Sequence, residues 1–188
     1  MNFTESELPE VWIVEPRVVA DSRGYFLESY REVDFIKNIG MEINFLQDNE
    51  SMSQKGVLRG LHYQLPPFSQ SKLVRVIKGG VLDVAVDIRK GSPNFGRYIL
   101  VDLNEENKKQ LFIPRGFAHG FLVTRDNTIF SYKVDNYYSP EYERGICFND
   151  TAIGIDWKMN SEYILSVKDQ NLPVLKDAEI FSYDDILY

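Results

Sequence analysis

The chain has 188 residues, which is enough for one domain with a sizeable core. Hydrophobic residues make up 44% and charged residues 26%, as in an ordinary globular protein. A formal net charge of −7 argues against a nucleic acid or an anionic membrane as partner, because both attract basic surfaces. A small anionic ligand stays compatible with that charge, since a few local cations suffice to bind it.

The single cysteine and residues 1–10 bear on the cellular compartment of the protein. Cys147 is the only cysteine, so no intrachain disulfide can form, and a lone free thiol is typical of a reducing environment. Residues 1–10 are acidic and lack the apolar segment of a signal peptide. No apolar run approaches membrane-spanning length. We therefore expect a cytoplasmic protein with no membrane partner.

Short runs of β-branched and aromatic residues, punctuated by Gly and Pro, fill most of the chain. The one helix expected early in the chain covers residues 31–40, with a closing glycine. The expected strands cover 11–21, 24–30, 44–51, 56–64, 72–79, 80–89, 97–103, 109–114, 119–124, 127–134 and 137–148. Such a succession predicts an antiparallel sandwich or barrel.

Residues 72–89 form the clearest predicted hairpin, with its turn around Gly79. Alternation places Lys72, Asp83 and Asp87 on one face, among aliphatic residues, while the other face of the second strand is wholly aliphatic. A charged group among aliphatic residues needs water or a partner. The charged face is therefore either an ordinary exposed surface or the lining of a polar pocket.

The two histidines, His62 and His119, raise the question of a metal site. The local string His62-Tyr63-Gln64 has glutamine where cupin metal sites carry a second histidine, and residues 113–121 resemble the second cupin motif. Two histidines cannot supply a site with three histidine ligands, which leaves only a site with two histidines and one carboxylate. We expect no metal.

Polar residues accompany His62: Arg59 on its own predicted strand, and Gln47, Asn49 and Lys72 on other predicted strands. Polar groups concentrated within apolar strands suggest a shared concave site. From the residues alone, a general acid–base role and a structural role of His62 are equally well supported.

Longer strings carry a family resemblance: "DSRGYFLESY", "FLQDNESMSQKGVLRGLHYQ", "QSKLVRVIKGGVLDVAVDIRKGSPNFGRY", "IPRGFAHGF", "YKVDNYYSPEYERGI" and "SVKDQNLP". Through them the chain resembles the dTDP-4-dehydrorhamnose 3,5-epimerase family from about residue 21 to 173. The resemblance implies an all-β, cupin-like jelly-roll barrel with a few short helices, which works without metal or cofactor. It implies one epimerase domain over 1–188, a barrel at about 40–150 and an irregular tail at 158–188.

The resemblance also implies an activity. The substrate is dTDP-4-keto-6-deoxy-D-glucose, and inversion at C3 and C5 gives dTDP-4-keto-L-rhamnose on the route to dTDP-L-rhamnose. The C4 ketone acidifies both C–H bonds, so inversion needs a base, a stabiliser for the enolate oxygen and an acid on the opposite face. The implied catalytic residues are His62 as base, Asp169 as its carboxylate partner, Lys72 as the cation near the C4 oxygen and Tyr132 as the acid.

Ten binding residues are implied in the same way: Arg23, Phe26, Glu28, Gln47, Asn49, Arg59, His119, Tyr138, Glu143 and Lys168. Phe26 and Tyr138 would flank the thymine, and Asp83 would stand behind Lys72 or His119. Residues 10–30 would join a homodimer interface. The alternatives are an epimerase of one centre acting on a related dTDP-4-keto sugar, a cupin that binds sugar nucleotides without turnover, and a metal-dependent cupin enzyme.

Overall fold

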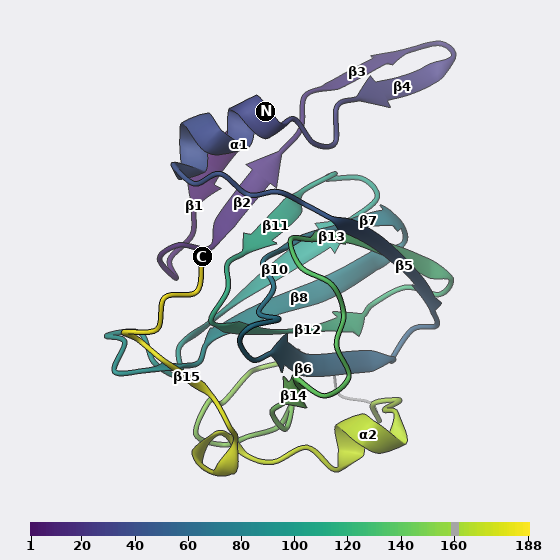
Figure 1. Cartoon of the computed structure of the whole chain (residues 1–188). Coiled ribbons are helices and arrows are strands. Elements are labelled where there is room, and N and C mark those ends of the chain that lie inside the picture. The colour runs from purple at the N-terminus through teal and green to yellow at the C-terminus, as the bar shows by residue number, and fades with distance from the viewer. Residues whose placement is uncertain (159–161) are drawn as a thin grey trace.

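Two antiparallel sheets lie face to face in the protein, and a computed structural model describes residues 1–158 and 162–188 (Figure 1). One sheet has six strands in the order β1-β2-β11-β7-β13-β5, and the other has five in the order β10-β8-β12-β6-β14. Strands far apart in the chain are neighbours in both sheets. This arrangement confirms the expected all-β jelly roll.

The element bounds follow the predicted strands closely in the middle of the chain. The six-stranded sheet contains β1 (Asn2–Glu5), β2 (Trp12–Glu15), β11 (Gln110–Ile113), β7 (Lys72–Lys78), β13 (Thr128–Val134) and β5 (Gln47–Ser53). The five-stranded sheet contains β10 (Tyr98–Asn104), β8 (Gly80–Asp87), β12 (Phe117–Val123), β6 (Leu58–Gln64) and β14 (Glu143–Gly145). The strand expected at 137–148 thus shrinks to the short β14.

The predicted hairpin over 72–89 is wrong, because β7 and β8 belong to different sheets. Gly79, with a φ of 82°, carries the chain from one sheet to the other, and a Cβ there would lie 2.2 Å from Thr128 Oγ1. Alternation predicts which side chains share a face but not which strand is the partner. The faces themselves are as predicted, since Val74 of β7 and Ala85 of β8 pack in one core between the sheets.

Hydrophobic clusters fill three layers. The inner cluster joins the facing sides of the two sheets and includes Leu111, Phe121 and Phe130. A second cluster lies on the outer side of the five-stranded sheet, where the C-terminal segment contributes Trp157 and Phe181. That segment contains α2 (Val167–Gln170), the 3-10 turn Leu175–Asp177 and β15 (Phe181–Ser182), which pairs in parallel with β9 (Arg89–Lys90). The C-terminal segment therefore covers the barrel on one side.

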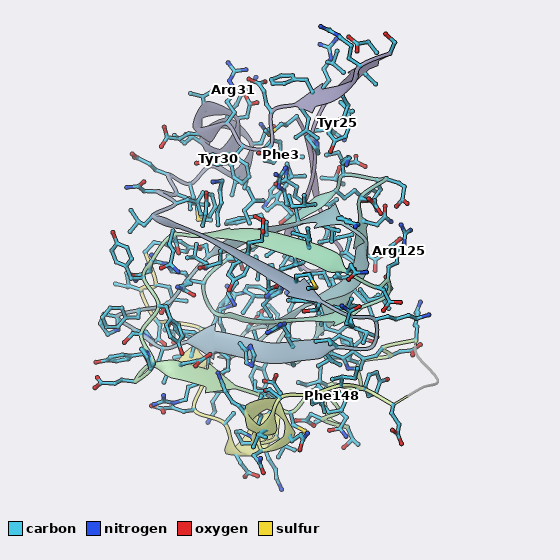
Figure 2. All side chains as sticks on the ribbon, turned by 90° about the vertical axis from the view of Figure 1, so that its right-hand side faces the viewer. Phe3, Tyr25, Tyr30, Arg31, Arg125 and Phe148 are labelled. Carbon is cyan, nitrogen blue, oxygen red and sulfur yellow. The ribbon has the colours of Figure 1, made fainter. Side chains whose placement is uncertain are left out.

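The third cluster lies under α1 (Glu32–Ile39), which ends at Gly40 as predicted, and this glycine has the left-handed conformation. Figure 2 shows Phe3 and Tyr30 beside this helix, and both rings pack against Phe35 at centroid distances of 5.0 Å. The hairpin of β3 (Val18–Asp21) and β4 (Gly24–Leu27) projects from the body of the protein (Figure 1). Its pairing is confined to itself, so the apolar side chain of Phe26 stays 68% exposed.

Candidate active site

Two cavities, of about 350 and 550 Å³, adjoin each other and share part of their lining. Four residues line both of them, namely His62, Lys72, Tyr132 and Glu143. His62 and Glu143 come from the five-stranded sheet, and Lys72 and Tyr132 come from the six-stranded sheet. The shared residues therefore face one another across the space between the sheets, which makes these cavities the candidate active site.

A bulge in β6 brings Arg59 and His62 to the same cavity. The register pairs His62 with His119 but Arg59 with Phe121, so β6 carries one residue more than β12 over this stretch. Residues three apart on a regular strand point to opposite faces, and one extra residue cancels that inversion. Gly60, with a φ of 118°, makes the bulge, and a Cβ on it would lie 2.6 Å from the Cα of Gly120.

The imidazole of His62 is paired with Asp169 of α2. His62 Nε2 donates to Asp169 Oδ1 at 2.5 Å, and the carboxylate is only 4% exposed. Burial raises the pKa of Asp169, but the hydrogen bond and charge of His62, the hydrogen bond from Ser166 and the charge of Lys168 together outweigh burial and hold the pKa below its usual value. A carboxylate accepting from Nε2 leaves Nδ1 as the ring nitrogen that can take a proton.

Lys72 supplies a cation beside the histidine. Its Nζ lies 3.5 Å from the backbone oxygen of His62, to which it donates. Burial of the ammonium group lowers the pKa of Lys72 to about 8, although the nearby carboxylates of Asp83 and Glu143 oppose the shift. The polar-pocket interpretation of the charged face is thus the correct one, because Lys72 lines both cavities.

A buried hydrogen-bonded pair, His119 and Asp83, lies near Lys72. His119 Nε2 donates to both oxygens of Asp83, at 3.0 and 3.1 Å. Burial raises the pKa of Asp83 and lowers that of His119. His119 also lines the larger cavity, where its ring stacks on Phe130 at a centroid distance of 6.1 Å. Of the two partners considered for Asp83, the hydrogen-bonded one is therefore His119.

Tyr132 enters the cavities from β13, in the sheet opposite His62. Burial raises the pKa of its phenol above the ordinary value, partly countered by the charge of Arg59. A phenol with a raised pKa stays protonated through the neutral range, so it can donate a proton. Arg59 itself is oriented by Ser53, whose hydroxyl accepts from the guanidinium at 3.1 Å.

Polar side chains continue around the mouth. Tyr138 donates its hydroxyl to Glu143 at 2.8 Å, and Lys168 of α2 forms an ion pair with the same carboxylate. Burial would raise the pKa of Glu143, but these two contacts lower it below its usual value. Gln47 donates to Asn49 at 2.7 Å, and both line the smaller cavity.

Three of the expected binding residues lie elsewhere in this chain. Arg23 sits at the tip of the β3–β4 hairpin, where it pairs with Asp21, and Phe26 and Glu28 are exposed on or beside that hairpin. None of the three lines either cavity. The other expected site residues line a cavity, except Asp83, which lies behind His119.

Sequence reasoning missed several polar residues around the cavities, among them Ser53, Gln64 and Ser166. Ser53 orients Arg59, Gln64 lines the smaller cavity, and Ser166 contacts Asp169. Alternation along β6 could have indicated Gln64, two positions after His62. Serine is too common for the other two to stand out, because their importance comes from contacts across the fold.

Within residues 1–158 and 162–188, no cluster of three or more His, Cys, Asp or Glu side chains has a metal-binding arrangement. In the same part of the chain, no helix has the length and apolar character needed to span a membrane.

The fold and the cavities define a cupin-like jelly-roll protein in which ionisable side chains of both sheets line a shared space. The family model for dTDP-4-dehydrorhamnose 3,5-epimerase matches residues 5–177. The dTDP-4-dehydrorhamnose 3,5-epimerase of Shigella flexneri is 51% identical over 181 residues, covering 96% of this chain and 99% of the relative. The chain belongs to this family of isomerases.

Solved structures agree with that assignment. A dTDP-6-deoxy-D-glucose-3,5-epimerase from Legionella pneumophila, in complex with dTDP-4-keto-L-rhamnose, has a TM-score of 0.94 at 44% identity, over 98% of this chain and 99% of that one. A 3′-monoepimerase from Streptomyces bikiniensis, in complex with dTDP-quinovose, has a TM-score of 0.87 at 33% identity, over 92% and 87%. The same fold therefore serves epimerases of two centres and of one.

Proposed function

We propose that the protein inverts C3 and C5 of dTDP-4-keto-6-deoxy-D-glucose and forms dTDP-4-keto-L-rhamnose, for dTDP-L-rhamnose biosynthesis. One observation carries the proposal: His62, with Asp169 behind it, and Tyr132 face a shared cavity from opposite sheets. Epimerisation needs a base and an acid on opposite faces of one carbon. The related enzymes named above support the choice of a dTDP-4-keto sugar.

The chemistry assigns a role to each group. His62 Nδ1 takes the proton from the carbon beside the ketone, and the bonding electrons move into a C=C bond while charge develops on the C4 oxygen. The ammonium of Lys72 stabilises that oxygen. Tyr132 then donates its phenolic proton to the same carbon from the other face. Proton exchange with water resets both groups, and the second carbon repeats the cycle.

The larger cavity supports a deoxy sugar. Beyond the polar residues its wall is formed by apolar side chains, namely Val57, Leu58, Phe121, Phe130, Ile164 and Leu165. An apolar wall favours a methyl substituent, because a hydroxyl placed there would lose its hydrogen bonds to water. The 6-methyl group of the proposed substrate meets that requirement.

The remaining residues are proposed to bind substrate. Arg59, Gln47, Asn49, Glu143 and Lys168 offer charge and hydrogen bonds to the sugar and the diphosphate. Tyr138 presents a ring at the mouth for the base. Arg23, Phe26 and Glu28 are proposed to complete a partner's site in a homodimer, which accords with the exposed apolar surface of the projecting hairpin. A cytoplasmic location stays a prediction.

Solvent deuterium incorporation tests the proposal. The protein is incubated with dTDP-4-keto-6-deoxy-D-glucose in D₂O, a 4-reductase traps the product, and NMR follows C3 and C5. Deuterium at both centres with dTDP-L-rhamnose formed is the expected result. Deuterium and inversion at one centre would make the protein a monoepimerase, the function of the Streptomyces relative. No exchange at either centre would contradict an epimerase acting on this sugar.

A further inference from the structure

The carboxylate of Asp169 is held at both oxygens. Oδ1 accepts from His62 at 2.5 Å, and Oδ2 accepts from the hydroxyl of Ser166 at 2.9 Å. The same hydroxyl accepts from the backbone N–H of Asp169 at 3.1 Å. The hydroxyl of Ser166 therefore both donates a hydrogen bond to Asp169 and accepts one from it. This double contact fixes the carboxylate about its terminal torsion, which is otherwise a soft one.

Ser166 is itself tied to the strand that carries the histidine. Ile164, two positions earlier, forms a parallel bridge with Val57, and the backbone N–H of Leu58 donates to the oxygen of Ile164 at 3.0 Å. The N–H of Ile164 donates to the oxygen of Gly56 at 2.9 Å. These bonds lock the segment before α2 to the start of β6. Ser166 thus fixes Asp169 relative to β6, the strand that carries His62, although Asp169 and His62 lie far apart in the sequence.

We propose that Ser166 is a positioning residue for proton transfer by His62. Its hydroxyl holds Asp169 so that Oδ1 accepts from Nε2, which keeps the imidazole in the tautomer whose Nδ1 has a free lone pair. A carboxylate free to rotate would hold Nε2–H less strictly, and the other tautomer would gain population. This inference rests on the proposed role of His62 as base.

A purely structural role predicts a different defect. Ser166 is also the N-cap of α2, and that helix carries Lys168, which forms an ion pair with Glu143 at the cavity mouth. Fraying of the helix would displace Lys168 and weaken substrate binding, which raises KM. Loss of the carboxylate orientation alone would lower kcat instead. The two roles are therefore separable by kinetics.

Two substitutions of Ser166 and one matched control make the kinetic test. In Ser166→Ala we expect kcat to fall about 10- to 100-fold, the range for losing a group that orients a reactive residue, with KM within about twofold. Ser166→Thr keeps a hydroxyl at the same carbon and should recover most of the loss. The control is Ser92→Ala, which removes a buried hydroxyl donating to Asp87 at 2.6 Å, outside both cavities. It should keep kcat unchanged.

A second readout does not depend on turnover. The chain has only two histidines, so the imidazole nitrogens can be assigned by ¹⁵N NMR. We expect His62 as the Nε2–H tautomer in the wild type and in Ser166→Thr, and a shift toward mixed tautomers in Ser166→Ala. His119, bonded to Asp83, serves as the internal control and should not change.

Three results would overturn the inference: an unchanged kcat and tautomer in Ser166→Ala, an equal defect in the Ala and Thr variants, or a defect confined to KM. A wild-type protein without turnover would instead contradict the proposed function. In that case the imidazole spectra would still decide whether Ser166 positions Asp169 and His62.

Discussion

His62 and Asp169 are 107 positions apart in the chain, yet Nε2 of the one lies 2.5 Å from Oδ1 of the other. The contact joins a strand of the five-stranded sheet to a short helix of the C-terminal segment. That segment covers the barrel and at the same time delivers a carboxylate to the candidate active site. Folding of the C-terminal segment onto the barrel therefore brings the proposed base and its carboxylate partner together.

Replacing the proposed base should separate chemistry from binding. In His62→Ala we expect kcat to fall by about 10²- to 10⁴-fold, the usual contribution of a general base, while the Kd for dTDP stays within about twofold. Steady-state kinetics and calorimetric titration with dTDP measure the two quantities. Normal turnover in this variant would refute the assignment of His62.

Tyr132→Phe should uncouple exchange from inversion. His62 can still remove a proton and return one from solvent on the same face, so deuterium should continue to enter the substrate in D₂O. Delivery of the proton from the other face should fail, so inverted product should form at least about tenfold more slowly. NMR records both rates in one sample. Exchange and inversion falling together would count against Tyr132 as the acid on the opposite face.

The alkaline limb of the pH profile of kcat/KM should follow the deprotonation of Lys72. Its pKa is lowered to about 8 by burial, so the ammonium loses its proton as pH rises through that value. Since the charged form is the one proposed to stabilise the C4 oxygen, kcat/KM should fall above about pH 8 by roughly tenfold per pH unit. Tyr132 does not account for this limb, because burial raises its pKa above the ordinary value.

Lys72→Arg provides the control for that profile. A guanidinium stays charged because its pKa lies far above the pH range of the assay, so whatever activity the variant retains should lack the alkaline limb near pH 8. A limb at the same pH in the variant would mean that another group titrates there.

Mixed dimers should show whether the β3–β4 hairpin acts on a partner's cavity. One protomer carries Arg23→Ala with Phe26→Ala, and the other carries His62→Ala. If the hairpin serves the partner, a mixed dimer has one intact site, and activity at low substrate should rise to about half of that of the wild type per dimer. Each variant alone should be poorly active under the same conditions. Activity no higher than that of the separate variants, in a sample shown to contain mixed dimers, would contradict sharing.

Local patterns predicted much of this protein. The strand-rich composition, the helix closing at Gly40 and the alternation of side chains along residues 72–78 and 80–87 all follow from periodicity and from residue type, because these express local backbone preference and the choice between water and core. A chain with two histidines likewise cannot supply three histidine ligands to a metal, whatever its fold. Motif resemblance added Tyr132 and Asp169, which composition and spacing alone would have left among many tyrosines and surface acids.

Tertiary structure decided which strands pair and which side chains meet. Alternation cannot distinguish a hairpin from a turn that crosses between sheets, so the separation of β7 from β8 was not predictable. It would also have placed Arg59 and His62 on opposite faces, and only the close approach of Gly60 to Gly120 reverses that. Ser166 became visible through its contact with Asp169. The sequence thus determined the elements and their faces, whereas the site depends on long-range contacts that no local pattern encodes.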